Sequence, residues 1–250
     1  MSSPSVQSLR KGLRLLELLL DGSHGIASAA EACDMPISTA HRMLATLRAS
    51  GFLIQPNRGS YLPGPMLTDL GSALRYREVI ARVARPVLDR LARRTGLTAH
   101  LGVFDTDMVT YLVKASGRVP MLTRENMQLE AYCSGIGKVL LANLSHEDAG
   151  AYLATGPFVQ LTEATIVDPS ALALALEEVR RSGVGFDEGE FQQGLSCVAV
   201  PVLSPRGQVC AAISLSSSDG CATMPVEARI GNLKASAASI AACLSGQRAS

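Results

Sequence analysis

The stretch STAHRMLATL, residues 38–47, is typical of a helix with one face on a small hydrophobic core and the other toward solvent. At about 100° per residue, its apolar face holds Ala40, Met43, Leu44 and Leu47. The opposite face and its flanks carry Ser38, Thr39, His41, Arg42, Ala45, Thr46 and Ala49. A single arginine among short side chains would let this helix lie close to another molecule.

Two further helices are expected before this one. Leucines at i, i+4, i+7 and i+11 predict a core-facing helix over residues 8–21, closed by Gly22; they are Leu9, Leu13, Leu16 and Leu20. Ser28 to Glu31 has the spacing of a capping box, which predicts a second short helix beginning at Ser28. Ser38 would cap the third helix and Gly51 would end it.

The residues after this third helix predict a small hairpin. The β-prone segments 52–55 and 60–62 flank the turn sequence PNRG at residues 56–59. Three short helices followed by such a hairpin form the winged helix-turn-helix pattern, whose third helix enters a DNA major groove. Pro65 then opens another helix, with Leu67, Leu70 and Leu74 on one face, which we expect to act as a linker until Pro86 interrupts it.

The rest of the chain alternates strands and helices. Strands are expected at 98–104 and 108–113 around a short acidic turn, and at 197–203 and 208–216 around the turn SPRG at 204–207. Helices are expected near residues 135–144, 169–181 and 226–244. Strand pairs joined by tight turns favour an antiparallel α+β sheet over a doubly wound parallel one. We therefore expect a DNA-binding domain at 1–64, a linker helix at 65–85 and a second domain at 86–250.

Length and composition are those of a globular protein. The 250 residues, 47% of them apolar, suffice for one large domain or two ordinary ones. No apolar run approaches the roughly 20 residues that a membrane-spanning helix needs. The serine-rich first ten residues lack the apolar core of an export signal, so we expect a cytoplasmic protein with no membrane partner. The six cysteines form no C-x-x-C pair, which argues against a zinc knuckle or a disulfide scaffold.

Charge is distributed unevenly along the chain. Residues 1–64 hold six basic and four acidic residues, 65–95 hold seven and three, and 96–250 hold ten and fifteen. This polarity indicates that the first third faces a polyanion. Double-stranded DNA is the expected partner, with Arg42 as the candidate for a bidentate guanine contact and Ser38 and Thr39 suited to phosphates. The candidate DNA contacts are Arg10, Lys11, Ser28, Ser38, Thr39, His41, Arg42, Thr46 and, at the wing tip, Arg58.

Several segments together resemble the IclR family of bacterial transcriptional regulators. In the first third they are SLRKGLRLL at residues 8–16, STAHRMLATL at 38–47 and GFL at 51–53. In the remainder they are SGIGKVLLA at 134–142, GLSCVAVPV at 194–202 and AAISLS at 211–216. The resemblance extends over residues 8–216 and implies a GAF-like α+β C-terminal domain. Such a domain would bind a small metabolite, usually an organic or aromatic acid.

The resemblance also implies which residues line the effector pocket. They are Met121, Leu129, Gly135, Ile136, Asp187, Leu195, Cys197, Ser214 and Ser216. The chemistry agrees in part, because backbone N–H groups of Gly135 and Gly137 at a helix N-terminus could receive a carboxylate. Ser214 and Ser216, two apart on a strand, share a face and could donate beside it. Met121, Leu129 and Leu195 would provide apolar walls.

Other pocket residues qualify this picture. Asp187 would repel an anionic effector unless it is protonated or accepts from an effector hydroxyl, and we take the hydroxyl as the working hypothesis. Cys133 and Cys197 are interpreted as small apolar wall residues instead of reactive thiols. Glu130 and Tyr132 stand where family members commonly have proline and histidine, and Ile136 is bulkier than the usual alanine. The effector is therefore expected to be smaller or differently shaped than is usual in the family.

Other functions fit the sequence less well. The segment around Lys138 lacks the spacing of a phosphate-binding loop, and no G-x-S-x-G elbow accompanies the histidines, so we expect no enzyme and no cofactor. The acidic residues Asp187, Glu188 and Glu190 are interpreted as a solvated turn and not as metal ligands. A homodimer or dimer of dimers is expected, because one recognition helix reads too few base pairs. The alternative is a metabolite-binding protein whose basic N-terminal region mediates protein contacts.

Overall fold

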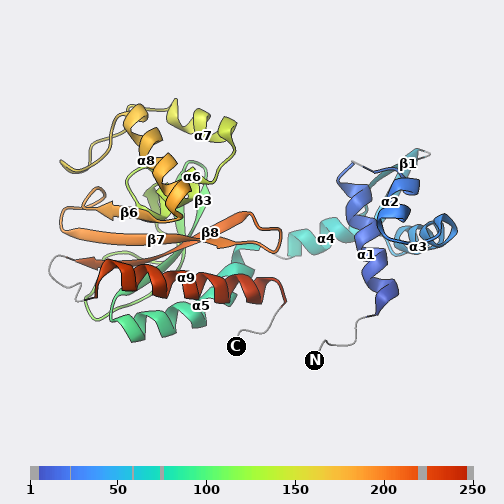
Figure 1. The fold of residues 1–250 in the computed structure, drawn as a ribbon, viewed down its shortest axis with the longest axis horizontal. Helices are drawn as coiled ribbons and strands as arrows, with labels where there is room; N and C mark the ends of the chain where they lie inside the picture. Colours follow the sequence, from blue (N-terminus) through green and yellow to red (C-terminus); the bar gives the residue numbers. More distant parts are fainter. Residues whose placement is uncertain (1–5, 23, 58, 74–75, 219–223, 247–250) are drawn as a thin grey trace. The chain divides into compact units, whose positions relative to one another are not determined.

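The computed structural model describes residues 6–22, 24–57, 59–73, 76–218 and 224–246. The chain divides into two compact units, Met1–Arg75 and Tyr76–Ser250 (Figure 1). Each unit has a hydrophobic core of its own. Among the described helices, none combines the length and the hydropathy that a bilayer crossing requires.

The first unit has the winged helix-turn-helix fold that the sequence predicts. Its helices are α1 (Gln7–Leu20), α2 (Ile26–Ala32), α3 (Ile37–Ala49) and α4 (Pro65–Ala73). Between α3 and α4, the strands β1 (Leu53–Asn57) and β2 (Ser60–Pro63) pair antiparallel and form the wing (Figure 1). Leu67 on α4 packs against the core of this unit, whereas Leu70 is exposed. Leu74 and the wing-tip residue Arg58 lie outside the described residues.

The face that α1 turns to the core differs from the expected one. The stripe predicted from leucine spacing is wrong at its start, because Leu9 and Leu13 are 62% and 50% exposed. The buried residues of this helix are Leu15, Leu16, Leu18 and Leu19. A run of leucines satisfies more than one helical face, and the packing of α2 and α3 selects the face that is buried.

Two expected helix caps in the first unit are also wrong. Gly25 precedes α2, and Ser28 lies inside the helix, where its hydroxyl donates to the Gly25 carbonyl at 3.0 Å. Pro36 precedes α3, so Ser38 is its second residue and not its cap. Both helices therefore begin before the expected serine, at Ile26 and at Ile37. Ser28 and Ser38 are consequently surface residues of the first helical turns.

The second unit is built on a six-stranded antiparallel sheet, as the expected α+β class requires. The strand order is β5-β4-β3-β8-β7-β6. Their bounds are β3 (Thr98–Asp105), β4 (Met108–Ala115), β5 (Gln128–Glu130), β6 (Gly185–Glu188), β7 (Leu195–Leu203) and β8 (Val209–Ser218). The short strands β5 and β6 at the two edges are not expected from the sequence, because neither shows an alternating pattern of useful length.

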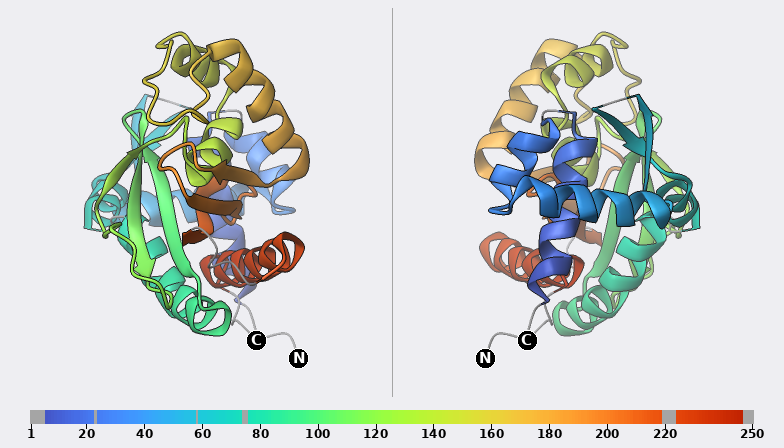
Figure 2. Two further views of the ribbon diagram at one scale, coloured as in Figure 1. Left: turned by 90° about the vertical axis from the view of Figure 1, so that its left-hand side faces the viewer. Right: turned by 90° about the vertical axis from the view of Figure 1, so that its right-hand side faces the viewer.

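Helices cover both faces of this sheet. On one face α5 (Tyr76–Thr95) and α9 (Val226–Leu244) pack against alternate residues of the central strands (Figure 2). On the other face lie α6 (Gly135–Ala142), α7 (His146–Leu153) and α8 (Pro169–Ser182). The expected helices at 135–144, 169–181 and 226–244 are confirmed, and α7 is an addition. We call the side of the sheet that α6 covers the α6 face.

The expected end of the linker helix at Pro86 is wrong. Pro86 lies inside α5, which continues to Thr95. Proline lacks an N–H and leaves the carbonyl four residues earlier without its helical partner. Pro86 lies on the exposed side of α5, where water can bind that carbonyl, while Ile80, Ala84 and Leu88 are buried on the other side. The first turns of α5, expected as linker, thus belong to the core of the second unit.

Candidate functional site

The outward face of α3 is the first candidate site. Ala40 and Leu44 are buried and Met43 and Leu47 are half-buried, which confirms the apolar face expected from the sequence. The opposite side is exposed along the whole helix, with Ser38, His41, Arg42, Ala45, Thr46 and Ala49. The Thr46 hydroxyl donates to the Arg42 carbonyl at 3.1 Å, so it is partly engaged by the helix itself. This face is exposed and carries mainly short side chains around one arginine, which suits a helix that lies in a major groove.

The Arg42 side chain lacks the intramolecular partners that three other basic residues of the first unit have. Arg48 donates to the Gln55 side chain on the wing at 2.9 Å, and Arg14 pairs with Glu17 at 3.0 Å. Lys11 forms an ion pair with Asp34 and donates to its backbone carbonyl. Within the described residues, the Arg42 guanidinium, like that of the exposed Arg10 on α1, has no hydrogen-bond or ion-pair partner. Its guanidinium therefore keeps all its donors for an external acceptor.

Lys11 and Arg10 have different positions on α1. Lys11 joins α1 to the segment between α2 and α3 through Asp34, and its side chain is only 24% exposed. Its expected contact with a phosphate would have to compete with this pair. Arg10 is exposed, and Thr39 is half-buried at the start of α3.

The second candidate site is a polar row across the α6 face. Register pairs Thr98 with Ser216, Ser216 with Cys197, and Cys197 with Asp187, so one residue from each of four neighbouring strands lines up. All of them are buried. We call Thr98, Ser216, Cys197 and Asp187 the outer row. A polar row inside a sheet core is expensive unless it is hydrogen-bonded or serves a ligand.

A second row lies one residue pair further along the same strands. It runs from Lys114 through His100 and Ser214 to Ala199 and Gly185. His100 and Ser214 are both 0% exposed. We call this the inner row. The sequence does not indicate His100 as a site residue, because its position opposite Ser214 depends on the pairing of strands more than a hundred residues apart.

Helix α6 stands directly over these rows and restricts what fits there. A side chain at Gly135 would come within 3.3 Å of the Cys197 sulfur, and one at Gly137 would collide with the Ala131 carbonyl. Ser134 caps the helix, and its hydroxyl accepts from the Gly137 N–H at 3.1 Å. The expectation of a free N–H at Gly137 is therefore wrong. The backbone N–H groups of Gly135 and Ile136 belong to the first turn, where an α-helix provides no partner for them.

Ionisation around the outer row is set by burial. Burial raises the pKa of Asp187 to about 6, against the opposing effect of hydrogen bonds that its Oδ1 accepts from the backbone N–H groups of Glu190 and Phe191. Burial also raises the pKa of Cys197 to about 11 and that of Cys133 to about 12. Both thiols stay protonated at neutral pH, in agreement with their interpretation as apolar wall residues.

The acidic residues at the end of β6 are only partly the solvated turn that the sequence suggests, because Glu188 is exposed but Asp187 and Glu190 are buried. Asp187 and Glu190 are 2% and 7% exposed. Glu190 forms a buried ion pair with Lys138 of α6, and its backbone carbonyl accepts from the Thr165 hydroxyl at 2.7 Å. Among the described residues, no three His, Cys, Asp or Glu side chains come together as a metal site would require. The segment instead holds α6 against the sheet.

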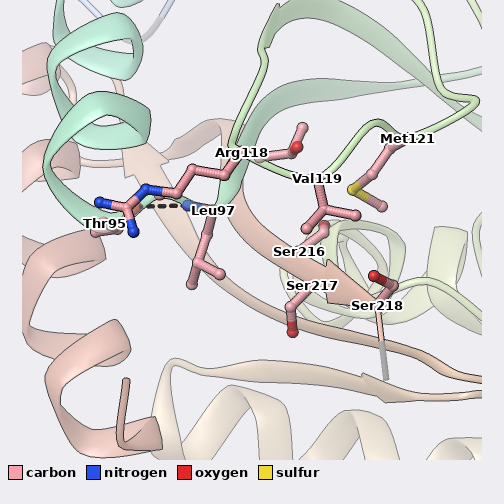
Figure 3. Close-up of a pocket in the computed structure, with 10 residues that line it drawn as sticks. Thr95, Leu97, Arg118, Val119, Met121, Ser216, Ser217 and Ser218 are labelled. Carbon is pink, nitrogen blue, oxygen red and sulfur yellow. Dashed lines mark hydrogen bonds between the residues drawn. The ribbon is translucent and has the colours of Figure 1, made fainter. Parts of the chain in front are cut away.

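The outer row opens onto a cavity of about 180 Å³. Thr98, Ser216 and Ser218 line it from the sheet, and Val119 and Met121 from the segment after β4 (Figure 3). Met121 and Ser216 thus lie together as expected. Leu195 pairs with Ser218 at the same end of the sheet, while Leu129 and Ile136 belong to the core under α6 and α8.

The departures from the common family pattern have structural counterparts. Tyr132 stacks on Phe158 with ring centroids 4.7 Å apart, and its hydroxyl donates to the Val159 carbonyl at 2.7 Å. A methyl group of Ile136 would lie only 2.9 Å from a Cβ at Gly102, so this isoleucine fills the space over the middle of β3.

Comparison with known proteins identifies the two domains in which these candidate sites lie. Residues 8–56 match the family model of the IclR helix-turn-helix domain, and residues 73–242 match that of the bacterial transcriptional regulator IclR C-terminal domain. The chain belongs to the IclR family. Its members named below are regulators of transcription, so this IclR-family chain is a DNA-binding regulator with an effector domain, and not an enzyme.

Relatives within the IclR family match over most of their length. The HTH-type transcriptional regulator XynR of Escherichia coli is 33% identical over 86% of this chain and 87% of its own. The transcriptional repressor IclR of the same organism is 31% identical, over 84% and 80%. Among solved structures, the IclR of Thermotoga maritima has a TM-score of 0.63 at 27% identity, covering 96% of this chain and 100% of its own. An IclR homologue from Microbacterium hydrocarbonoxydans, complexed with 4-hydroxybenzoate, has a TM-score of 0.63 at 26% identity with the same coverage.

Proposed function

We propose that this regulator reads its operator with α3 and changes its operator affinity when a small organic or aromatic acid binds over the α6 face. The proposed operator reading rests on the exposed Arg42 guanidinium, which has no partner within the described residues and lies among short side chains. The proposed effector binding is supported by the buried polar rows beside a cavity. A structural relative that holds 4-hydroxybenzoate makes an aromatic acid the natural first candidate.

The proposed assembly is a homodimer or a dimer of dimers. Residues 1–64 would act as the DNA-binding domain and Tyr76–Ser250, which includes the second half of the expected linker at 65–85, as the effector domain. Two copies of α3 on two half-sites approximately double the discrimination energy of one. Because it acts on chromosomal DNA in a bacterial regulator family, we place its activity in the cytoplasm.

Arg42→Ala tests the DNA-reading face. Operator duplexes are first selected from a random pool by the wild-type protein, and binding is then measured by fluorescence anisotropy. We expect Arg42→Ala to lose about 1 to 3 kcal/mol of preference for the selected duplex over a scrambled one, since a bidentate guanine contact is removed. Arg14→Ala is the matched control, because it removes the same charge from an exposed position on α1 of the same unit.

The control separates base reading from general attraction to phosphate. Arg14→Ala should at most weaken both duplexes alike and leave the preference intact. An unchanged preference in Arg42→Ala would remove this residue from base recognition. If the wild-type protein selected no duplex at any salt concentration, the proposal of operator reading would fail as a whole.

A thermal-shift screen of aromatic and short aliphatic carboxylic acids tests the effector half. A ligand at 100 times its dissociation constant stabilises the folded state by about 2.7 kcal/mol, which shifts the unfolding temperature measurably. We expect at least one acid, with 4-hydroxybenzoate as the first probe, to stabilise the protein. A screen without any stabilising acid would contradict the proposed effector class.

A further inference from the structure

The inner row contains a buried ring nitrogen without a partner. Within the described residues, His100 Nδ1 makes no hydrogen bond, although the residue is completely buried. His100 and Ser214 are directly paired across β3 and β8, so their side chains are neighbours on the α6 face. The Ser214 hydroxyl, also completely buried, bonds to no nitrogen or oxygen atom and has only the weakly bonding thiol of Cys197 as a partner. Leaving a buried polar atom unpaired costs about 1 to 3 kcal/mol, so this nitrogen beside a weakly bonded hydroxyl indicates a position that a ligand atom completes.

The other side of the His100 ring is held in place. Its Nε2 lies 2.8 Å from the Thr123 hydroxyl, and its ring stacks on Tyr111 with centroids 4.5 Å apart. Burial, and to a lesser degree the Lys114 charge, lower the pKa of His100 to about 3. The imidazole is therefore neutral at physiological pH and carries one proton. If the Thr123 hydroxyl donates to Nε2, that proton is on Nδ1, facing the unpaired side.

Position along the strands makes this pair the inner end of the site. On β3, Thr98 lines the cavity, His100 follows two residues further in, and Gly102 lies under Ile136. On β8, Ser218 and Ser216 line the cavity, Ser214 follows, and Ala212 is in the core. His100 and Ser214 do not line the cavity themselves but are the next residues inward from those that do, so a molecule that extends from the cavity along these strands would reach them last. Beyond them the site is closed by apolar packing.

The charges nearby indicate which group would arrive there. Lys114, the partner of His100 in the inner row, donates from Nζ to the carbonyls of Met121 at 2.7 Å and Thr123 at 2.5 Å, and brings a positive charge to this end. Asp187 lies at the far end of the outer row, three strands from His100. Arg118, which follows β4 and lines the cavity, adds a second positive charge on the same side of the sheet. An acid is thus attracted at its carboxylate by the side that carries Lys114 and Arg118 and repelled by the Asp187 end.

We propose that His100 is a specificity-determining residue of the effector site, donating from Nδ1 to a carboxylate oxygen of the acid beside the Ser214 hydroxyl. This inference rests on the proposed function, because it assigns the binding geometry of the same effector. The carboxylate enters first and lies over the inner row. The remainder of the acid then faces the outer row, where Asp187 can accept from a hydroxyl group.

Calorimetric titration with 4-hydroxybenzoate and with its uncharged amide tests this assignment. Should another acid of the screen give the largest thermal shift, that acid and its amide replace the pair. His100→Phe keeps a ring to stack on Tyr111 but removes the donor, so we expect the acid to bind about tenfold or more weakly and its preference over the amide to disappear. His100→Asn places an amide N–H near the Nδ1 position and should stay within about threefold of the wild-type protein.

Two further variants complete the comparison. Ser214→Ala should weaken acid binding in the same way as His100→Phe, because it removes the neighbouring donor. His146→Phe makes the same chemical change on the exposed surface of α7 and should leave acid binding unchanged. Equal acid binding in His100→Phe and wild-type protein, with Ser214→Ala impaired, would overturn the role of His100 and leave the proposed function intact. If no acid binds the wild-type protein, both the role of His100 and the proposed effector class are wrong.

The tautomer of His100 gives a readout that needs no effector. The chain has four histidines, and replacing the other three, His24, His41 and His146, none of which is buried, assigns the ring ¹⁵N resonances of His100 by elimination. We expect a neutral ring with its proton on Nδ1 and no titration between about pH 5 and 8. A proton on Nε2 instead would mean that Nδ1 cannot donate, and would overturn the proposal even if the variants failed to fold.

Discussion

Asp187 shows how burial sets the ionisation of a residue in the candidate effector site. Its folded-state pKa of about 6 lies above the unfolded value because burial disfavours the carboxylate. Its stabilising contribution is therefore complete below the unfolded pKa and is lost as pH rises through about 6. An anionic effector should likewise meet less repulsion from this residue on the acid side of pH 6.

Asp187→Asn tests the pH dependence at the residue scale. The amide oxygen can still accept from the Glu190 and Phe191 N–H groups, so the variant chiefly removes the titration. From pH 7.5 to pH 5 we expect wild-type protein to gain about 1 to 1.5 kcal/mol in the free energy of unfolding relative to the variant. Urea unfolding at a series of pH values measures this difference in the free energy of unfolding. Glu147→Gln, at an exposed position, serves as the control. A difference between wild-type protein and Asp187→Asn that does not change with pH would contradict the raised pKa.

At the scale of elements, α6 is positioned by polar contacts as much as by packing. Gly135 and Gly137 let it approach the sheet and the Ala131 backbone, and Ser134 caps it. Lys138, buried on this helix, pairs with Glu190 after β6. A buried pair of this kind contributes little net stability compared with apolar residues, but removing one partner leaves an uncompensated charge.

Lys138→Met tests whether this pair holds α6 in place. The single variant leaves Glu190 buried without its partner, so we expect the free energy of unfolding to fall by about 3 to 5 kcal/mol. Combining it with Glu190→Leu should restore most of that loss, because no buried charge remains. Lys234→Met, on the exposed side of α9, controls for the loss of a lysine. A double variant no more stable than Lys138→Met would show that the ion pair itself, and not the unpaired charge, matters.

At the scale of the whole molecule, the basic charge of the chain serves two purposes. Arg77 pairs with Asp105 at 2.7 Å and Arg85 with Glu125 at 2.7 Å, so these α5 arginines neutralise acidic residues of the second unit. Arg82, Arg90 and Arg93 of the same helix are exposed and form no ion pair within the described residues, so α5 keeps positive charge of its own. An effector can change operator affinity only if it binds two arrangements of the protein with different affinity.

A stabilising acid should change operator affinity and assembly shape together. We expect a 5- to 150-fold change in operator affinity, which corresponds to a coupling of about 1 to 3 kcal/mol. Small-angle scattering of the same samples should register a changed distance between the DNA-binding units. Unaltered scattering and unaltered operator affinity with saturating acid would argue against this mechanism.

The sequence by itself determined features that depend on neighbours along the chain. The apolar and polar faces of α3 follow from helical periodicity alone, and the wing and the β7–β8 hairpin follow from turn residues between β-prone segments. The outward position of Arg42 could be predicted for the same reason. Family resemblance added the effector-pocket residues, several of which the structure aligns in the outer row.

Only the tertiary structure decided features that depend on distant partners. Leu9 and Leu13 are exposed because packing chose another leucine face of α1, and Pro86 stays helical because its side of α5 faces solvent. The pairing of His100 with Ser214 depends on strand register across more than a hundred residues. Periodicity specifies which side chains share a face, whereas their neighbours across the sheet are fixed only when the strands pair and the core closes.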